Sequence, residues 1–174
     1  TLYSLPITVG SIDTSLLEAY KPFLAFDPRA KRDTFANYFV NNINLTNAYK
    51  NRDKEKGYGG FSRDIWGAEI LVDSLDTVCT VNPAIACASY AYLPQDAIQS
   101  MRAFYDRFGD ALFTEYGFRR RIDIDDNAVA DAYDAENQAA VAVMIENGRS
   151  GLVWSLFSRN RGIQKVVENY FSTE

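Results

Sequence analysis

Residues 137–157 read NQAAVAVMIENGRSGLVWSLF, and the prediction of the fold starts from them. In residues 135–147 apolar side chains extend around most sides of a helix, which is typical of a helix buried inside a domain. Gly148 and Gly151 interrupt this pattern, and residues 152–157 begin a second apolar helix. We therefore expect an inner helix that is followed directly by another packed helix.

Further helices are expected on the N-terminal and C-terminal sides of this stretch. Apolar residues recur at helical spacing, and prolines and glycines stand where helices begin and end. No segment shows a convincing strand pattern, so the sequence predicts an all-α fold of about seven helices. The other expected helices span residues 12–26, 29–50, 83–91, 94–109 and 163–171.

Two charged stretches are expected to be exposed. Residues 51–56 form a charged run that we interpret as a solvated turn. Residues 119–126 place three arginines next to three aspartates, which we interpret as an exposed, mobile loop.

The composition excludes several classes of function. A formal net charge of −5 argues against a nucleic-acid or anionic-membrane partner, because phosphate binders need a basic face. No stretch approaches the ~18 consecutive apolar residues of a membrane span. The chain contains no histidine, which excludes Ser-His-Asp and Cys-His catalysis and histidine-ligated zinc. The sequence predicts neither a metal site nor a cofactor.

Aromatic residues are abundant, at 14% of the chain. An aromatic-rich core explains most of them. The alternative is that some line a sugar cleft, because aromatic faces stack on the C–H faces of pyranose rings. Both interpretations stay open for Trp66, whereas Trp154 is expected in the core because it shares an amphipathic helix with Leu152 and Phe157.

The stretch 137–157 resembles the C-terminal signature of the glucoamylase-like family. This family includes endo-β-1,2-glucanases and the transglycosylase domain of cyclic β-1,2-glucan synthases. Other blocks are similar to family motifs in the same order along the chain, so the resemblance extends from about Asn41 to the C-terminus. These blocks are residues 41–49, Tyr58-Gly59 with Trp66-Gly67, residues 82–94 and Tyr116-Gly117-Phe118.

For the fold, the resemblance implies an (α/α)6 toroid built of antiparallel helix pairs. About seven helices are too few to close such a ring, and the chain begins with Thr1 rather than Met. We therefore expect residues 1–174 to be the C-terminal portion of a single toroid domain whose N-terminal half is missing. The open edge should expose apolar surface that the missing half would cover.

For function, the resemblance implies a glycoside hydrolase or transglycosylase that acts on a glucan, with β-1,2 linkages as the family precedent. An oligosaccharide or polysaccharide would be its substrate, and the resemblance favours a periplasmic or secreted location. The chain alone is expected to be inactive, because one catalytic carboxylate can come from the missing half. Two alternatives stay open: a non-catalytic or degenerate glucan-binding module, and a helical interaction scaffold without a sugar ligand.

Glycoside hydrolysis normally needs two carboxyl groups. Glu69 and Asp73 would share a face if their segment is helical, and Glu136 begins the predicted inner helix. These three are the predicted catalytic residues, although a solvated acidic face and an ordinary helix-terminal charge are the alternatives. The predicted substrate-binding residues are Tyr58, Trp66, Tyr116, Asn137 and Gln138.

The sequence departs from the family pattern near the expected cleft. The family usually has a Thr-Ala-Ser-Asp run after its Trp-Gly, where this chain has Ala68-Glu69-Ile70-Leu71. The family's frequent aspartate before the glutamine is Asn137 here, and an amide cannot act as an acid. We nevertheless expect the loops that carry Tyr58, Trp66 and Tyr116 to meet near the start of the helix at Ala135. Glu146 is expected to pair with Arg149 in a structural network.

Overall fold

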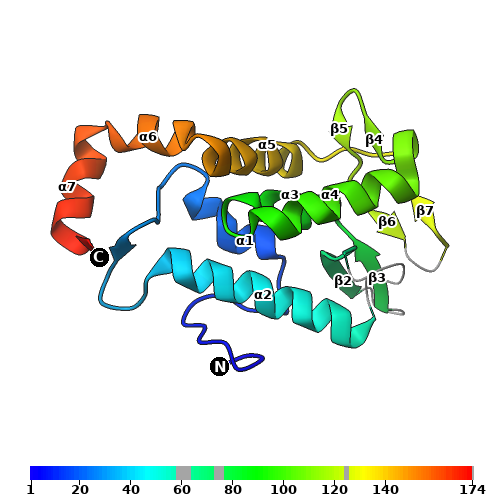
Figure 1. Ribbon diagram of the computed structural model, residues 1–174, viewed down its shortest axis with the longest axis horizontal. Coiled ribbons are helices and arrows are strands. Elements are labelled where there is room, and N and C mark those ends of the chain that lie inside the picture. Colours follow the sequence, from blue (N-terminus) through cyan, green and yellow to red (C-terminus); the bar gives the residue numbers. More distant parts are fainter. Residues whose placement is uncertain (58–63, 73–76, 124–125, 174) are drawn as a thin grey trace.

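The computed structural model describes residues 1–57, 64–72, 77–123 and 126–173. In these ranges the fold is mainly helical, as predicted, and small β-strands gather at one end (Figure 1). The α-helices are α1 (Leu16–Tyr20), α2 (Tyr38–Lys56), α3 (Pro83–Ala88), α4 (Pro94–Phe108), α5 (Ala135–Arg149), α6 (Leu152–Ser158) and α7 (Arg161–Tyr170). Three short 3-10 helices join them, η1 (Lys21–Phe23), η2 (Ser89–Ala91) and η3 (Gly109–Ala111).

The bounds of α2 differ from the predicted helix 29–50. The Asp33 carboxylate accepts hydrogen bonds from the backbone N–H groups of Phe35 and Ala36, and this turn keeps the chain out of a helix. The helix begins only after Asn37, whose side chain caps it through the N–H of Val40. It continues through the charged run to Gly57, so the predicted turn at residues 51–56 is wrong.

Two members of that charged run are buried, because α2 packs them against the next segment. Arg52 and Asp53 form an ion pair with Nη2 and Oδ1 2.5 Å apart. The other Asp53 oxygen accepts hydrogen bonds from the N–H groups of Gly67 and Ala68, at 2.8 and 2.9 Å. Arg52 donates in turn to the carbonyl of Ala68. The pair therefore attaches Ala68, at which the next strand begins, to α2.

The prediction of an all-α fold is wrong at this end of the molecule. An antiparallel sheet has the strand order β2-β3-β6-β7. Its strands are short, so any alternation of apolar and polar residues was too brief to be recognised in the sequence. Residues 68–72 and 77–81 are nevertheless rich in the β-branched and apolar residues that favour strands. The strands are β2 (Ala68–Val72), β3 (Thr77–Val81), β6 (Ile122–Asp123) and β7 (Ala128–Val129).

Two smaller antiparallel pairs complete the strands. β4 (Phe113–Thr114) and β5 (Gly117–Phe118) form a hairpin, and β1 (Lys31–Arg32) pairs with β8 (Ser172–Thr173). Ile122 is buried in β6, so residues 119–126, which were expected to be an exposed loop, belong in part to the sheet.

The core lies between the helices, with α3 at its centre. α3 packs against both α4 and α5, and all of its residues are buried. The small residues of α3 allow this close approach on several sides. The predicted inner helix, α5, is less buried than expected, because only Ala140, Met144 and Asn147 are shielded from solvent. One face of α5 contacts α3, and its opposite side is uncovered in this chain. None of the helices in the described ranges has the length and apolar character needed to cross a bilayer.

Gly67, at the entry to β2, provides a test of this packing. Its φ is +112°, and a Cβ atom there would lie 2.7 Å from the carbonyl oxygen of Asn82 and 3.2 Å from Cβ of Ile85. We expect Gly67→Ala to lower the free energy of unfolding by at least about 2 kcal/mol more than Gly57→Ala. Gly57 is a matched control, because it also has a positive φ but no atom of the described residues lies within 4 Å of its added Cβ. Equal effects in urea unfolding would contradict the proposed clash.

Candidate active site

Three of the predicted site residues line one cavity at the first turn of α5. Glu69 reaches it from β2, and Glu136 and Asn137 reach it from α5. The cavity has a volume of about 110 Å³. Its other lining residues come from α1, η1 and their flanks and from the next turn of α5: Ser15, Leu17, Glu18, Lys21, Leu24 and Ala140.

The elements that carry the two glutamates are fixed by local hydrogen bonds. The carboxylate of Asp134 caps α5 by accepting from the N–H of Asn137 at 3.0 Å. Glu69 lies on β2, so the helix on which it would have shared a face with Asp73 is not formed at Glu69. Its Oε2 accepts a hydrogen bond from the side-chain amide of Asn82 at 3.3 Å, and Asn82 in turn caps α3.

Lys21 is the residue of this site that the sequence prediction missed. Its Nζ lies 2.9 Å from Glu136 Oε1 and 2.6 Å from Glu18 Oε1. The hydrogen bond to Glu136, followed by that to Glu18, raises the pKa of Lys21, so the ammonium stays charged at neutral pH. The i,i+3 pair of Glu18 and Lys21 could be read from the sequence. The contact with Glu136 could not, because it depends on how η1 packs against α5.

Trp66 does not lie in the cleft as a sugar platform. Its side chain is 2% exposed and belongs to the hydrophobic core, with the ammonium of Lys50 5.9 Å from the ring centroid. A ring that is buried to this extent offers no face to a sugar.

Tyr116 and Gln138 belong to a second feature, the β4–β5 hairpin. Tyr116 forms its turn and is 68% exposed, and its ring meets Tyr133 edge-to-face with centroids 5.7 Å apart. Gln138 Nε2 donates to the carbonyl of Phe118, so Gln138 attaches the hairpin to the first turn of α5. The hairpin therefore lies beside the cavity. The remaining predicted site residues, Tyr58 and Asp73, lie outside the described residues.

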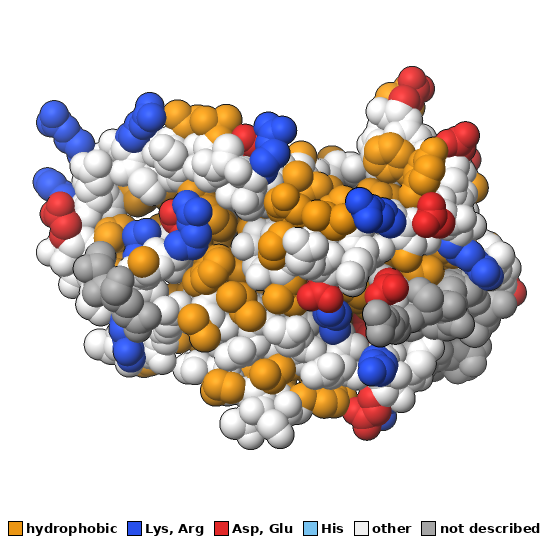
Figure 2. Space-filling model, viewed as in Figure 1, with side chains coloured by type: hydrophobic (Ala, Val, Ile, Leu, Met, Phe, Trp, Pro, Cys, Tyr) orange, Lys and Arg blue, Asp and Glu red, His pale blue; other side chains and the backbone are white. Residues whose placement is uncertain are grey.

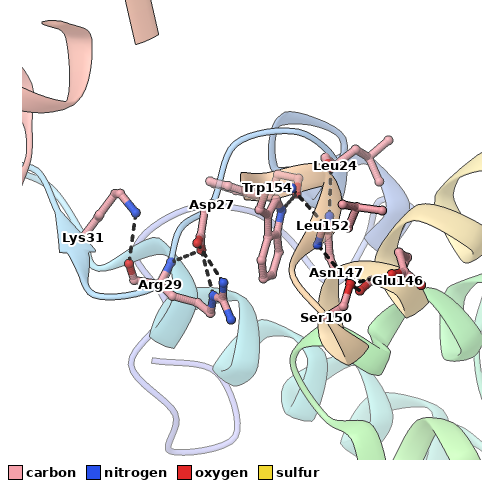
Figure 3. Close-up of polar contacts among 10 residues, drawn as sticks. Leu24, Asp27, Arg29, Lys31, Glu146, Asn147, Ser150, Leu152 and Trp154 are labelled. Atoms are coloured by element: carbon pink, nitrogen blue, oxygen red, sulfur yellow. Dashed lines mark hydrogen bonds and ion pairs between the residues drawn. The ribbon is translucent and has the colours of Figure 1, made fainter. Parts of the chain in front are cut away.

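Within the MIENGRSGLVW stretch, Asn147 and Trp154 bind the backbone of the segment that carries Lys21 (Figure 3). The Asn147 amide donates to the carbonyl of Leu24 at 2.9 Å, and its oxygen accepts from the N–H of Trp154 at 3.1 Å. The Trp154 indole donates to the carbonyl of Phe23 at 2.7 Å. The prediction that Trp154 is a core residue is confirmed.

Glu146 has the structural role that was predicted for it. Its Oε2 lies 3.0 Å from Arg149 Nη2, and its Oε1 accepts from the hydroxyl of Ser150. This part of the stretch joins α5 to α6. In the described part of the chain no group of three or more His, Cys, Asp and Glu side chains is placed to hold a metal ion.

A family model supports the resemblance found in the sequence. The model described as "Putative glucoamylase" matches residues 3–161. The chain is also 31% identical to the exo-β-1,2-glucooligosaccharide sophorohydrolase (non-reducing end) of Parabacteroides distasonis. That match covers 97% of this chain and 25% of the relative.

Solved structures agree with this match. A β-1,2-glucanase from Parabacteroides distasonis is similar with a TM-score of 0.84 and 30% identity, over 97% of this chain and 26% of that one. A "putative glucoamylase" from Bacteroides uniformis is similar with a TM-score of 0.87 and 28% identity, over 99% of this chain and 45% of that one. The chain thus spans between a quarter and just under half of the length of these relatives. Since the family model matches most of its residues, the chain belongs to the glucoamylase family that this model describes.

Proposed function

We propose that the whole protein is a glycoside hydrolase that acts on β-1,2-linked glucan, with its acid/base chemistry at the cavity between β2 and α5. The observation that carries this proposal is that Glu69 and Glu136 line the same cavity, in a chain of this family. Two carboxyl groups at one site are the usual requirement for hydrolysis of a glycosidic bond. The relatives named as β-1,2-glucan hydrolases support the choice of linkage.

The surroundings of the two glutamates suit them to different roles. The ammonium of Lys21 neutralises the charge of Glu136, which suits Glu136 to the ionised role, as general base or nucleophile. Glu69, whose carboxylate accepts a hydrogen bond from the neutral amide of Asn82, takes the remaining role in this proposal, that of the acid that protonates the oxygen of the leaving sugar. Asn137, which also lines the cavity, can position a hydroxyl group or a water but cannot exchange a proton.

We also propose that residues 1–174 form the C-terminal portion of a single (α/α)6 toroid domain. The packing of α3 against both α4 and α5 supports this arrangement. Apolar residues uncovered on the outer helices support it as well, because further helices of the same domain would bury them. These residues are Leu152, Leu156, Phe157, Val166 and Tyr170, and α7 has no buried residue. Figure 2 shows further hydrophobic side chains at the surface, between the positions at which Figure 1 draws α5 and α4.

The test is to incubate the whole protein with β-1,2-glucan and, separately, with α-1,4-glucan, and to analyse the products. We expect short β-1,2-linked oligosaccharides from the first and no release from the second. Binding of β-1,2-glucan without any product would instead identify a non-catalytic glucan-binding module. Neither binding nor cleavage of either glucan would refute the proposal.

A further inference from the structure

A second hollow lies at the β4–β5 hairpin. It has a volume of about 580 Å³, within the usual range of ligand sites, and it lies between α4 and the hairpin. We call it the hairpin hollow. Its lining residues are Tyr105, Asp110, Phe113, Thr114 and Glu115. Nothing in the proposed chemistry at Glu69 and Glu136 uses these residues.

The hairpin hollow combines exposed aromatic rings with carboxylate groups that can accept hydrogen bonds. Tyr105 is 53% exposed and Phe113 is 43% exposed. Their rings form a T-shaped pair, with an angle of 75° between the ring planes and centroids 6.3 Å apart. Asp110 and Glu115 are also exposed, and no hydrogen bond or ion pair to either is recorded within the described residues. In Figure 2 the protruding hairpin shows hydrophobic side chains below an acidic tip. Aromatic faces for C–H groups and carboxylates for hydroxyl groups are the two requirements of sugar binding.

The composition of the hollow distinguishes it from the surface on α6 and α7. That surface is mostly aliphatic, as expected of one that other helices of the domain cover. Charged residues are depleted at the centre of protein interfaces, because burying them there is costly. A surface with two unpaired carboxylates is therefore better suited to a hydrated, hydroxyl-rich ligand than to a covering helix.

The hairpin also connects this hollow to the candidate active site. Phe118 of β5 pairs with Phe113 of β4, and its carbonyl accepts a hydrogen bond from Gln138. Gln138 follows Asn137, which lines the cavity of the two glutamates. A polysaccharide bound at the active site could thus continue over the hairpin.

We propose that the hairpin hollow is an accessory binding site for glucose residues of a long β-1,2-glucan, distant from the bond that is cleaved. This inference rests on the proposed function, because it takes the substrate to be a β-1,2-glucan. A site of this kind binds only chains that are long enough to span from the cavity to the hairpin. It should therefore lower the KM for the polymer without affecting short oligosaccharides.

The experiment compares the whole protein with its Tyr105→Ala variant on polymeric β-1,2-glucan and on β-1,2-linked glucotriose. We expect the KM for the polymer to rise about tenfold, the loss of one good stacking contact. The kcat on both substrates and the KM for the trisaccharide should stay within about twofold. Tyr3→Ala is the matched control, because it removes another exposed tyrosine, which lies outside the helices α6 and α7 that the rest of the domain is proposed to cover. Its KM for the polymer should not change.

The possible outcomes separate this inference from the proposed function. An unchanged KM for the polymer in Tyr105→Ala, or an equal rise for both substrates, would overturn the inference while leaving the proposed function standing. If the parent protein does not cleave the glucan, affinity electrophoresis in β-1,2-glucan gels decides. Weaker retention of Tyr105→Ala than of the parent would support the accessory site although the proposed function had failed. Equal retention, or none for either protein, would overturn it.

Discussion

Replacing Glu69 with glutamine in the whole protein should lower kcat on β-1,2-glucan by about 100-fold or more, the usual scale for loss of a general acid. Glu136→Gln should have an effect of the same size. Glutamine keeps the shape of the side chain and its hydrogen-bonding oxygen, but it can neither donate nor accept the proton. The measurement is the rate of product release at saturating substrate, together with circular dichroism to verify the fold.

Glu18→Gln is the matched control for these two substitutions. Glu18 lines the same cavity and also contacts Lys21, but it lies on α1, beside Lys21 and not across the cavity from it. We expect a loss of about tenfold or less, because this variant changes the surroundings of Lys21 without removing a proposed proton carrier. Asp73→Asn completes the series of predicted acids. If Glu69, Asp73 and Glu136 could all be changed to amides with near-parental activity, the acid would lie elsewhere.

Replacing Asp53 with alanine should destabilise the protein by about 3–5 kcal/mol, the usual cost of leaving one member of a buried ion pair alone. The change takes the carboxylate away from the buried guanidinium of Arg52, and it removes the acceptor of two backbone N–H groups, those of Gly67 and Ala68. The free energy of unfolding from urea titration measures the effect.

Asp131→Ala provides the comparison. It breaks the ion pair between Arg119 and Asp131, whose acidic side chain is 87% exposed, so it should cost less than about 1 kcal/mol. A loss for Asp53→Ala as small as that for Asp131→Ala would show that the Arg52–Asp53 pair does not hold β2 on α2. Because β2 carries Glu69, we also expect Asp53→Ala to reduce activity.

The sequence predicted the helices better than the strands, for reasons that individual segments make clear. Helices such as α4 and α5 carry their start and stop signals within a few residues, as the cap at Asp134 shows. β6 and β7 contain two residues each, so β6 exists only because β3 lies beside it, and β7 only because β6 does. Burial was misjudged where it depends on such neighbours. In the sequence, Arg52 and Asp53 belong to a charged run of the kind that is usually exposed. They are buried because the chain returns at Gly67 and packs against them.

The candidate site shows the same limit. Glu69, Glu136 and Asn137 were chosen from motif order and chemistry, and they line one cavity although Glu69 lies far along the chain from the other two. Lys21 was not chosen, because its contact with Glu136 arises from the docking of η1 against α5. The sequence did not determine whether Trp66 lies in the cleft or in the core, because tryptophan is common in both. Its packing in the structure shows that it lies in the core.

The contacts of Asn147 and Trp154 have a consequence for how this protein tolerates insertions. Both side chains bind carbonyl groups of the main chain, at Leu24 and Phe23, so the side chains at these two positions can vary without loss of the hydrogen bonds. The spacing cannot vary, because Lys21 lies only two residues before Phe23, the first of these fixed positions. One residue inserted between Lys21 and Phe23 would move the ammonium away from Glu136 while leaving both proposed catalytic side chains in place. The contacts of Asn147 and Trp154 therefore constrain the number of residues in this segment and not the identity of its side chains.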